Sequence, residues 1–139
     1  MSAQAPSPTA SPSRPLSFLA FDFGTRRVGV ASGNTLLKQA APLKTISADG
    51  DARFAAIAQL IAQWNPDALV VGIPYHPDGT PHDNTRRAQR FARQLHGRYR
   101  LPVHEVDERY STTEALADGA ADVDAASAAV ILDQFLRAT

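Results

Sequence analysis

Several features common in protein sequences are missing from this chain of 139 residues. It contains no cysteine, which excludes disulfides and thiolate metal sites. No apolar run approaches the roughly 18 residues of a transmembrane helix. The N-terminus also lacks the positive segment and apolar core of a secretory signal. We therefore expect a soluble protein of the cytoplasm.

The chain also lacks a net charge, because fourteen basic residues balance fourteen acidic ones. Bulk charge therefore argues neither for nor against nucleic acid as a partner, and the distribution of charge matters more. Six of the basic residues fall within residues 86–100, and three of the acidic residues fall within residues 118–124. The chain is neutral overall but locally polarised.

The length suits one folded domain. Residues 1–15 hold four of the ten prolines and almost no large apolar side chain. Such a segment buries too little surface to offset the entropy lost on ordering, so we expect a disordered tail. The folded domain is predicted to occupy residues 16–139.

Five segments have the apolar pattern of strands. A turn at Gly24-Thr25 joins the first two and makes them antiparallel partners. The later ones alternate with helices. The five segments are residues 16–23, 26–33, 43–46, 68–74 and 102–109.

Four helices are predicted as well. Asn65-Pro66 ends the first and Gly97 ends the second, while Ser111 and Glu114 form a capping box that begins the third. The helices are expected in residues 51–64, in residues 85–97, from residue 111, and from residue 122 or 123 to residue 137. Their apolar positions are Phe54, Ile57, Ala58, Ile61 and Trp64 in the first, Ala88, Phe91, Ala92 and Leu95 in the second, and Ala128, Ile131, Leu132 and Phe135 in the last.

This order predicts an α/β fold with a mixed five-stranded sheet, three antiparallel strands followed by two parallel ones, and helices on both faces. Ligands of such sheets lie beyond the carboxyl ends of the parallel strands. Asp22 ends the first strand, Asp107 and Glu108 end the last, and Asp124 lies in the first turn of the last helix. All are expected at one edge of the sheet.

Carboxylates that converge at one edge are the usual ligands of Mg²⁺ or Mn²⁺, and such ions can drive phosphodiester cleavage. Each acid also has a structural interpretation. Asp22 could cap the turn beside it, Asp107 and Glu108 could pair with Arg109, and Asp124 could stabilise its helix N-terminus. The joint placement favours a metal site with Asp22, Asp124 and either Asp107 or Glu108 as ligands.

Arginines follow the fourth predicted strand. Arg86, Arg90 and Arg93 share one helix face, which is either a solvated surface or a set of phosphate contacts. The preceding loop, residues 74–84, is either an ordinary long loop or a mobile substrate loop.

Four blocks of the sequence resemble the YqgF (RuvX-like) family, whose members are described as pre-16S rRNA nucleases or Holliday-junction-resolvase-like proteins. The resemblance covers roughly residues 17–137, and the four blocks occur in the family's order. They are "FDFGTRRVGVA", "VVGIPYHPDGT…RRAQRFARQL", "VDERYSTTEA" and "VDAASAAVIL".

The resemblance implies an RNase H-like fold and a metal-dependent endonuclease that matures the 5′ end of 16S rRNA. Its implied partners are nucleic acid, either pre-16S rRNA or branched DNA, and the ribosome, and the protein is expected to be a monomer or a homodimer. The family's acidic positions match Asp22, Asp107, Glu108 and Asp124. Positions expected to contact nucleic acid match Arg26, Arg87 and Arg109, and we add Arg86 and Arg90 from the helix face.

Two other classes of function stay open. The segment "FDFGT" also resembles the phosphate loop of the actin, hexokinase and sugar-kinase superfamily, although those proteins bind ATP between two such domains. A non-catalytic module that binds RNA or the ribosome is the third class. Its support is the acidic stretch "ADGAADVD", residues 117–124, where family members usually carry lysines.

Overall fold

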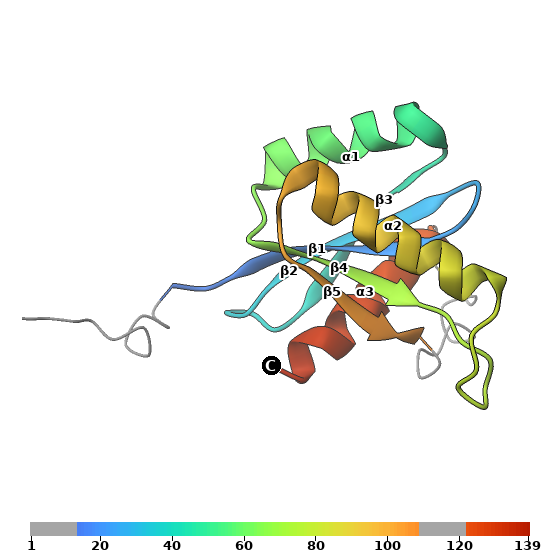
Figure 1. The fold of residues 1–139 in the computed structure, drawn as a ribbon. Helices are drawn as coiled ribbons and strands as arrows, with labels where there is room; N and C mark the ends of the chain where they lie inside the picture. The colour runs from blue at the N-terminus through green and yellow to red at the C-terminus, as the bar shows by residue number, and fades with distance from the viewer. Residues whose placement is uncertain (1–13, 109–121) are drawn as a thin grey trace, which may run out of the picture.

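A five-stranded sheet forms the centre of the computed structural model, which describes residues 14–108 and 122–139 (Figure 1). The strands are β1 (Ser17–Phe23), β2 (Val28–Asn34), β3 (Ala40–Ile46), β4 (Ala68–Ile73) and β5 (Val103–Asp107). The helices of this part of the chain are α1 (Gly50–Trp64), α2 (Asp83–Tyr99) and α3 (Val123–Arg137).

The strand order is β3-β2-β1-β4-β5. β1 pairs antiparallel with β2, and β2 pairs antiparallel with β3. β4 runs parallel to both β1 and β5. The predicted mixed sheet is therefore confirmed, and the carboxyl ends of β1, β4 and β5 meet at one edge, as the sequence required.

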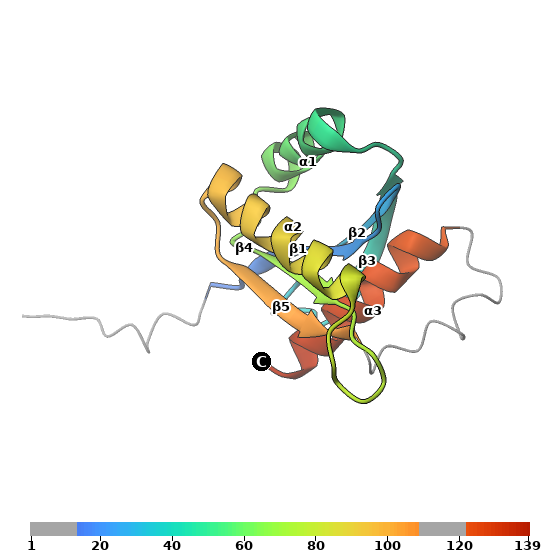
Figure 2. The ribbon, with the colours of Figure 1, turned by 45° about the vertical axis from the view of Figure 1, so that its right-hand side comes forward.

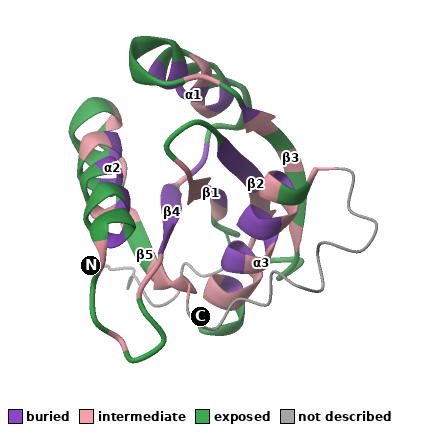
Figure 3. Cartoon of the chain, turned by 90° about the vertical axis from the view of Figure 1, so that its right-hand side faces the viewer, coloured by how far each residue is buried: buried purple, intermediate pink, exposed green. Residues whose placement is uncertain are grey.

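Helices cover both faces of the sheet (Figure 2). Leu19 and Phe21 of β1 pack with buried residues of α1 and α2, whereas Phe18 and Ala20 pack with those of α3. This alternation follows from the pleat of a strand, which sends successive side chains to opposite faces. Figure 3 shows the result, with buried residues on the central strands and on the inner sides of the helices.

The packing of α1 differs in part from the prediction. Phe54 and Ile57 are buried as expected, and Leu60 joins them. Ala58 is exposed and Trp64 is 42 % exposed, so the apolar positions at helical spacing are not all buried. Trp64 lies in the last helical turn, where neighbouring elements cover a side chain from fewer directions.

The second helix, α2, extends past the predicted stop at Gly97. It continues to Tyr99 and ends at Arg100, which adopts the left-handed conformation with φ 59°. The hydroxyl of Tyr99 donates a 2.7 Å hydrogen bond to the carbonyl of Phe54 in α1. A tertiary contact thus accompanies the extra residues of α2. The prediction that Gly97 ends the helix rested on local sequence and could not include this contact.

The last helix, α3, begins at Val123, as predicted. The Asp122 side chain caps it by accepting hydrogen bonds from the amide of Ala125 and the hydroxyl of Thr45. The helix expected from Ser111 lies outside the described residues.

Near the N-terminus, the sequence placed Arg14 in the disordered tail. In the structure Arg14 forms a 2.7 Å ion pair with Asp67.

Across residues 14–108 and 122–139, the helices fall short of the length and apolar character needed to span a bilayer.

Candidate active site at the carboxyl end of the sheet

Asp22 lies in a row of three paired residues that carries only one side chain. It pairs with Gly29 on β2 and with Gly72 on β4. Paired residues on neighbouring strands project to the same face, here the face covered by α3. The carboxylate of Asp22 therefore stands between two positions without side chains.

The two glycines allow other groups to approach Asp22 from either side. A Cβ on Gly29 would lie 1.9 Å from the carbonyl oxygen of Asp124, at the start of α3. A Cβ on Gly72 would lie 2.8 Å from Cγ of Glu108. A Cβ atom cannot approach another atom this closely. Only glycine at these two positions therefore allows α3 and Glu108 to flank Asp22.

Glu108 and Asp22 share a hydrogen bond that perturbs both carboxyls. Burial, then the negative charge of Asp22, and then that hydrogen bond raise the pKa of Glu108 to about 9. Burial is also the largest cause that raises the pKa of Asp22; the hydrogen bond from Glu108 lowers this pKa, and the charge of Asp124 raises it. At neutral pH Glu108 thus holds a proton, and its carboxyl group donates the hydrogen bond to Asp22.

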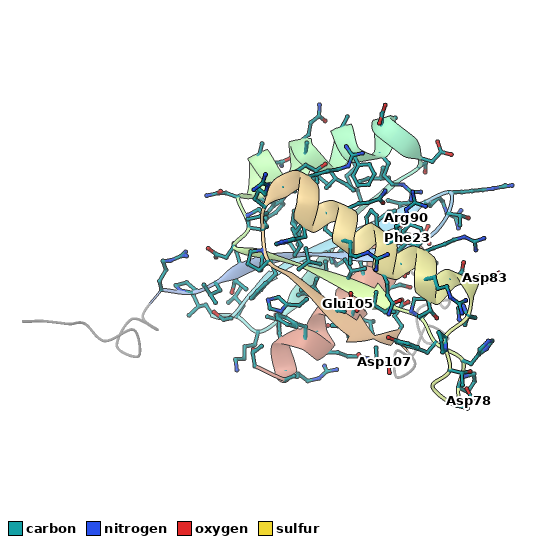
Figure 4. The ribbon with its side chains drawn as sticks, in the orientation of Figure 1. Phe23, Asp78, Asp83, Arg90, Glu105 and Asp107 are labelled. Carbon is teal, nitrogen blue, oxygen red and sulfur yellow. The ribbon has the colours of Figure 1, made fainter. Side chains whose placement is uncertain are left out.

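The structure distinguishes Glu108 from its neighbour Asp107. Val106 pairs with Gly72 and packs on the α3 face, while Asp107 pairs with Ile73, which packs on the opposite face with α1 and α2. Figure 4 shows Asp107 at the end of β5. The alternation of the strand therefore brings Glu108, rather than Asp107, to Asp22.

Asp124 completes the group from the α3 side. Its carboxylate forms a 2.9 Å ion pair with Arg27, whose side chain is 64 % exposed. An ion pair as exposed as this one contributes only about 0.2–1 kcal/mol, so it is easily exchanged for another partner. Arg26 was among the residues predicted for the site and Arg27 was not, because no pattern in the sequence separates these adjacent arginines.

An open depression of about 590 Å³ adjoins this group of acids. The turn between β1 and β2 lines it with Arg26 and Arg27, and Asp124 and Ser47 line it from other elements. Arg26, predicted to contact nucleic acid, therefore lines the same depression as Asp124. The depression offers room for a ligand that contacts carboxylates and guanidinium groups together.

The donor atoms present suit a hard divalent cation. Asp22, Glu108 and Asp124 offer only carboxylate oxygens, which are the ligands of Mg²⁺ and Mn²⁺. Within residues 14–108 and 122–139, no three acidic or histidine side chains are already arranged to hold a metal ion. The fit is thus one of chemistry: Asp22 and Glu108 form a close pair, and Asp124 would join once Arg27 releases it.

The predicted arginines have different surroundings. Arg86 pairs with Asp83 at 3.6 Å on the exposed side of α2. Arg87 donates a 3.0 Å hydrogen bond to Asn84. Arg90 lies beside Phe23, and both line a cavity on the α1–α2 side (Figure 4). Arg109 lies outside the described residues.

Sequence comparison places the chain among curated relatives. Residues 16–138 match the family model described as "RuvX: Holliday junction resolvase". A protein of Polaromonas sp. (strain JS666) is 68 % identical over 120 residues, which cover 86 % of this chain and 87 % of the relative. A protein of Burkholderia pseudomallei (strain 668) is 52 % identical over 135 residues, covering 92 % of each. Both relatives carry the name "Putative pre-16S rRNA nuclease".

Solved structures show the same fold at low sequence identity. RuvC of Thermus thermophilus superposes with a TM-score of 0.58 at 12 % identity, covering 88 % of this chain and 95 % of RuvC. The RuvC complex with a Holliday junction substrate gives a TM-score of 0.56 at 12 % identity, covering 88 % and 94 %. The predicted RNase H-like fold is confirmed by these neighbours. The family match over residues 16–138 and the relatives at 68 % and 52 % identity show that the chain belongs to the RuvX (YqgF) family.

Proposed function

We propose that this protein is a nuclease that hydrolyses phosphodiester bonds of structured nucleic acid with the help of Mg²⁺ or Mn²⁺, and that its substrate is the 5′ end of pre-16S rRNA. The observation that carries the proposal is the pair of Asp22 and Glu108. Two half-buried carboxyls lie against each other and are flanked by glycines, so one of them keeps a proton that a cation could replace. The relatives' names point to the same activity and to the same rRNA.

Each residue of the site has a role in this proposal. Asp22 and Glu108 would hold the cation, and Asp124 would be a further ligand after Arg27 turns away. The bound ion would supply the positive charge that phosphodiester cleavage requires. Arg27, once released from Asp124, and Arg26 would contact the phosphates of the bound strand, since planar guanidinium groups suit phosphate oxygens.

A nuclease assay with matched variants tests the proposal. The purified protein is incubated with Mg²⁺ or Mn²⁺ and with two substrates, an RNA that spans the 5′ end of pre-16S rRNA and a four-way DNA junction. Asp22→Asn and Glu108→Gln should each lower cleavage at least about 100-fold, as expected for loss of a metal ligand with its charge. Glu105→Gln is the control, because Glu105 lies exposed on the same strand as the candidate site.

The outcomes separate the alternatives. Cleavage that survives Asp22→Asn would remove the acid pair from the mechanism. Cutting of the junction alone would support a resolvase of branched DNA, as in the family description. Binding of RNA without any cleavage would support the non-catalytic module, in which Arg27 permanently neutralises Asp124.

A further inference from the structure

A second site lies across the sheet from the acids. A cavity of about 320 Å³ opens between α1 and α2 on the face opposite to Asp22. Its lining includes Arg53, Arg87 and Arg90, together with Phe23 and the first residue of α1, Gly50. Among the described residues that line it there is no acidic side chain, so three guanidinium groups share one small space whose walls carry no negative charge.

Arg53 is the buried member of this cluster. Only 5 % of its surface is exposed, yet within the described chain it forms no ion pair. Its guanidinium donates two hydrogen bonds, at 2.7 Å from Nε to the carbonyl of Ala48 and at 3.1 Å from Nη2 to the carbonyl of Thr25. It also lies 5.5 Å from the centre of the Phe23 ring.

A buried guanidinium with only neutral partners is costly, and an anion would offset that cost. Burial lowers the pKa of Arg53, and the negative charge of Asp49 opposes this effect. Asp49 is not among the residues that line the cavity. The two hydrogen bonds leave N–H groups of Arg53 available. The exposed side chains of Arg87 and Arg90 stand at the same cavity and can close on a ligand from the α2 side.

The cavity is close to the acids along the chain, although it faces the other way. Phe23 follows Asp22 directly, and the pleat sends the two side chains to opposite faces at the end of β1. Arg53 binds the carbonyl of Thr25, and Thr25 itself lines the depression beside Asp124. A nucleic-acid strand that bends over the end of β1 could therefore reach both the cavity and the depression beside Asp124.

We propose that this cavity binds a phosphate group of the nucleic acid, away from the phosphate that is cleaved. The proposal rests on the proposed nuclease function and names the part of the protein that holds the substrate on the far side of the sheet edge. Three guanidinium groups match the oxygens of a phosphate, and Gly50 adds the N-terminus of a 15-residue helix. The phosphate can be the terminal group of the strand or one of its internal phosphodiesters.

Binding measured without divalent metal tests this proposal independently of cleavage. The probes are inorganic phosphate and a 12-nucleotide single-stranded RNA with either a 5′-phosphate or a 5′-hydroxyl, all in EDTA. Arg90→Gln removes one arm of the cavity. The matched control is Arg93→Gln, because Arg93 is another exposed arginine of α2 and lines a different depression with His96 and Glu105.

We expect Arg90→Gln to weaken RNA binding about tenfold and to reduce the slope of log affinity against log salt by about 0.7. Arg93→Gln should change the affinity no more than about twofold. Inorganic phosphate should shift the NMR signal of the Arg53 Nε–H group, which reports from the cavity itself. A tenfold preference for the 5′-phosphate would identify a terminal group, whereas equal binding would identify an internal phosphodiester.

Equal effects of the two substitutions, or an Arg53 signal that stays in place, would overturn the proposal. The nuclease assay is separate from this result. If the protein cuts nucleic acid but Arg90→Gln and Arg93→Gln change the RNA affinity equally, only the proposal of a phosphate-binding cavity is refuted. If Arg90→Gln weakens RNA binding more than Arg93→Gln does but no cleavage occurs, only the nuclease proposal is refuted.

Discussion

Replacing Glu108 with glutamine is expected to change how the stability of the metal-free protein depends on pH. In the folded protein the pKa of Glu108 is raised from 4.5 to about 9, mainly by burial and by the charge of Asp22. Between these two values the folded state binds one more proton than the unfolded state. The free energy of unfolding therefore falls as pH rises through this window.

The size of the effect follows from one proton. A difference of one bound proton changes the free energy of unfolding by about 1.4 kcal/mol per pH unit, which amounts to about 4 kcal/mol between pH 5 and pH 8. The raised pKa of Asp22 acts in the same direction. In Glu108→Gln the amide still donates a hydrogen bond to Asp22 but does not titrate, so the contribution of Glu108 disappears.

Urea unfolding at pH 5, 6, 7 and 8 in EDTA measures this difference. The wild-type protein should lose stability more steeply with pH than Glu108→Gln, and the control Glu105→Gln should follow the wild type. Addition of Mg²⁺ at pH 8 should stabilise the wild type more than Glu108→Gln, because a ligand that binds only the folded state raises its stability. Parallel curves for wild type and Glu108→Gln would refute the shared proton.

Two further predictions concern the groups around this pair. Gly29→Ala should destabilise the protein by several kcal/mol in thermal or urea unfolding, because the new Cβ would lie 1.9 Å from a backbone oxygen of Asp124, whereas Gly97→Ala, in a helix with open space around it, should stabilise by up to about 1 kcal/mol; similar effects of both would contradict the close approach of α3. Arg27→Gln should raise the affinity for Mg²⁺ a few-fold in calorimetry, since it frees Asp124, and an unchanged or lower affinity would exclude Asp124 as a ligand.

Periodicity and chain order determined much of the fold. Apolar runs located all five strands, and the change to helical spacing located α1, α2 and α3. The boundary of β3 was predicted least well, because only one of its seven residues is buried and Pro42 interrupts its apolar pattern; β3 begins at Ala40 rather than near residue 43. The end of α2 was also missed, since Tyr99 is bonded to a residue 45 positions away.

The sequence by itself determined that Asp22, the pair Asp107 and Glu108, and Asp124 would come to one edge of the sheet, because strand direction follows from the order of strands and helices. Only the tertiary structure decided that Glu108 rather than Asp107 meets Asp22, since this depends on the register of β5 against β4. The same holds for the ion pair of Arg27 and for the unpaired burial of Arg53. Such contacts join residues far apart in the chain, and no local pattern encodes how their side chains meet.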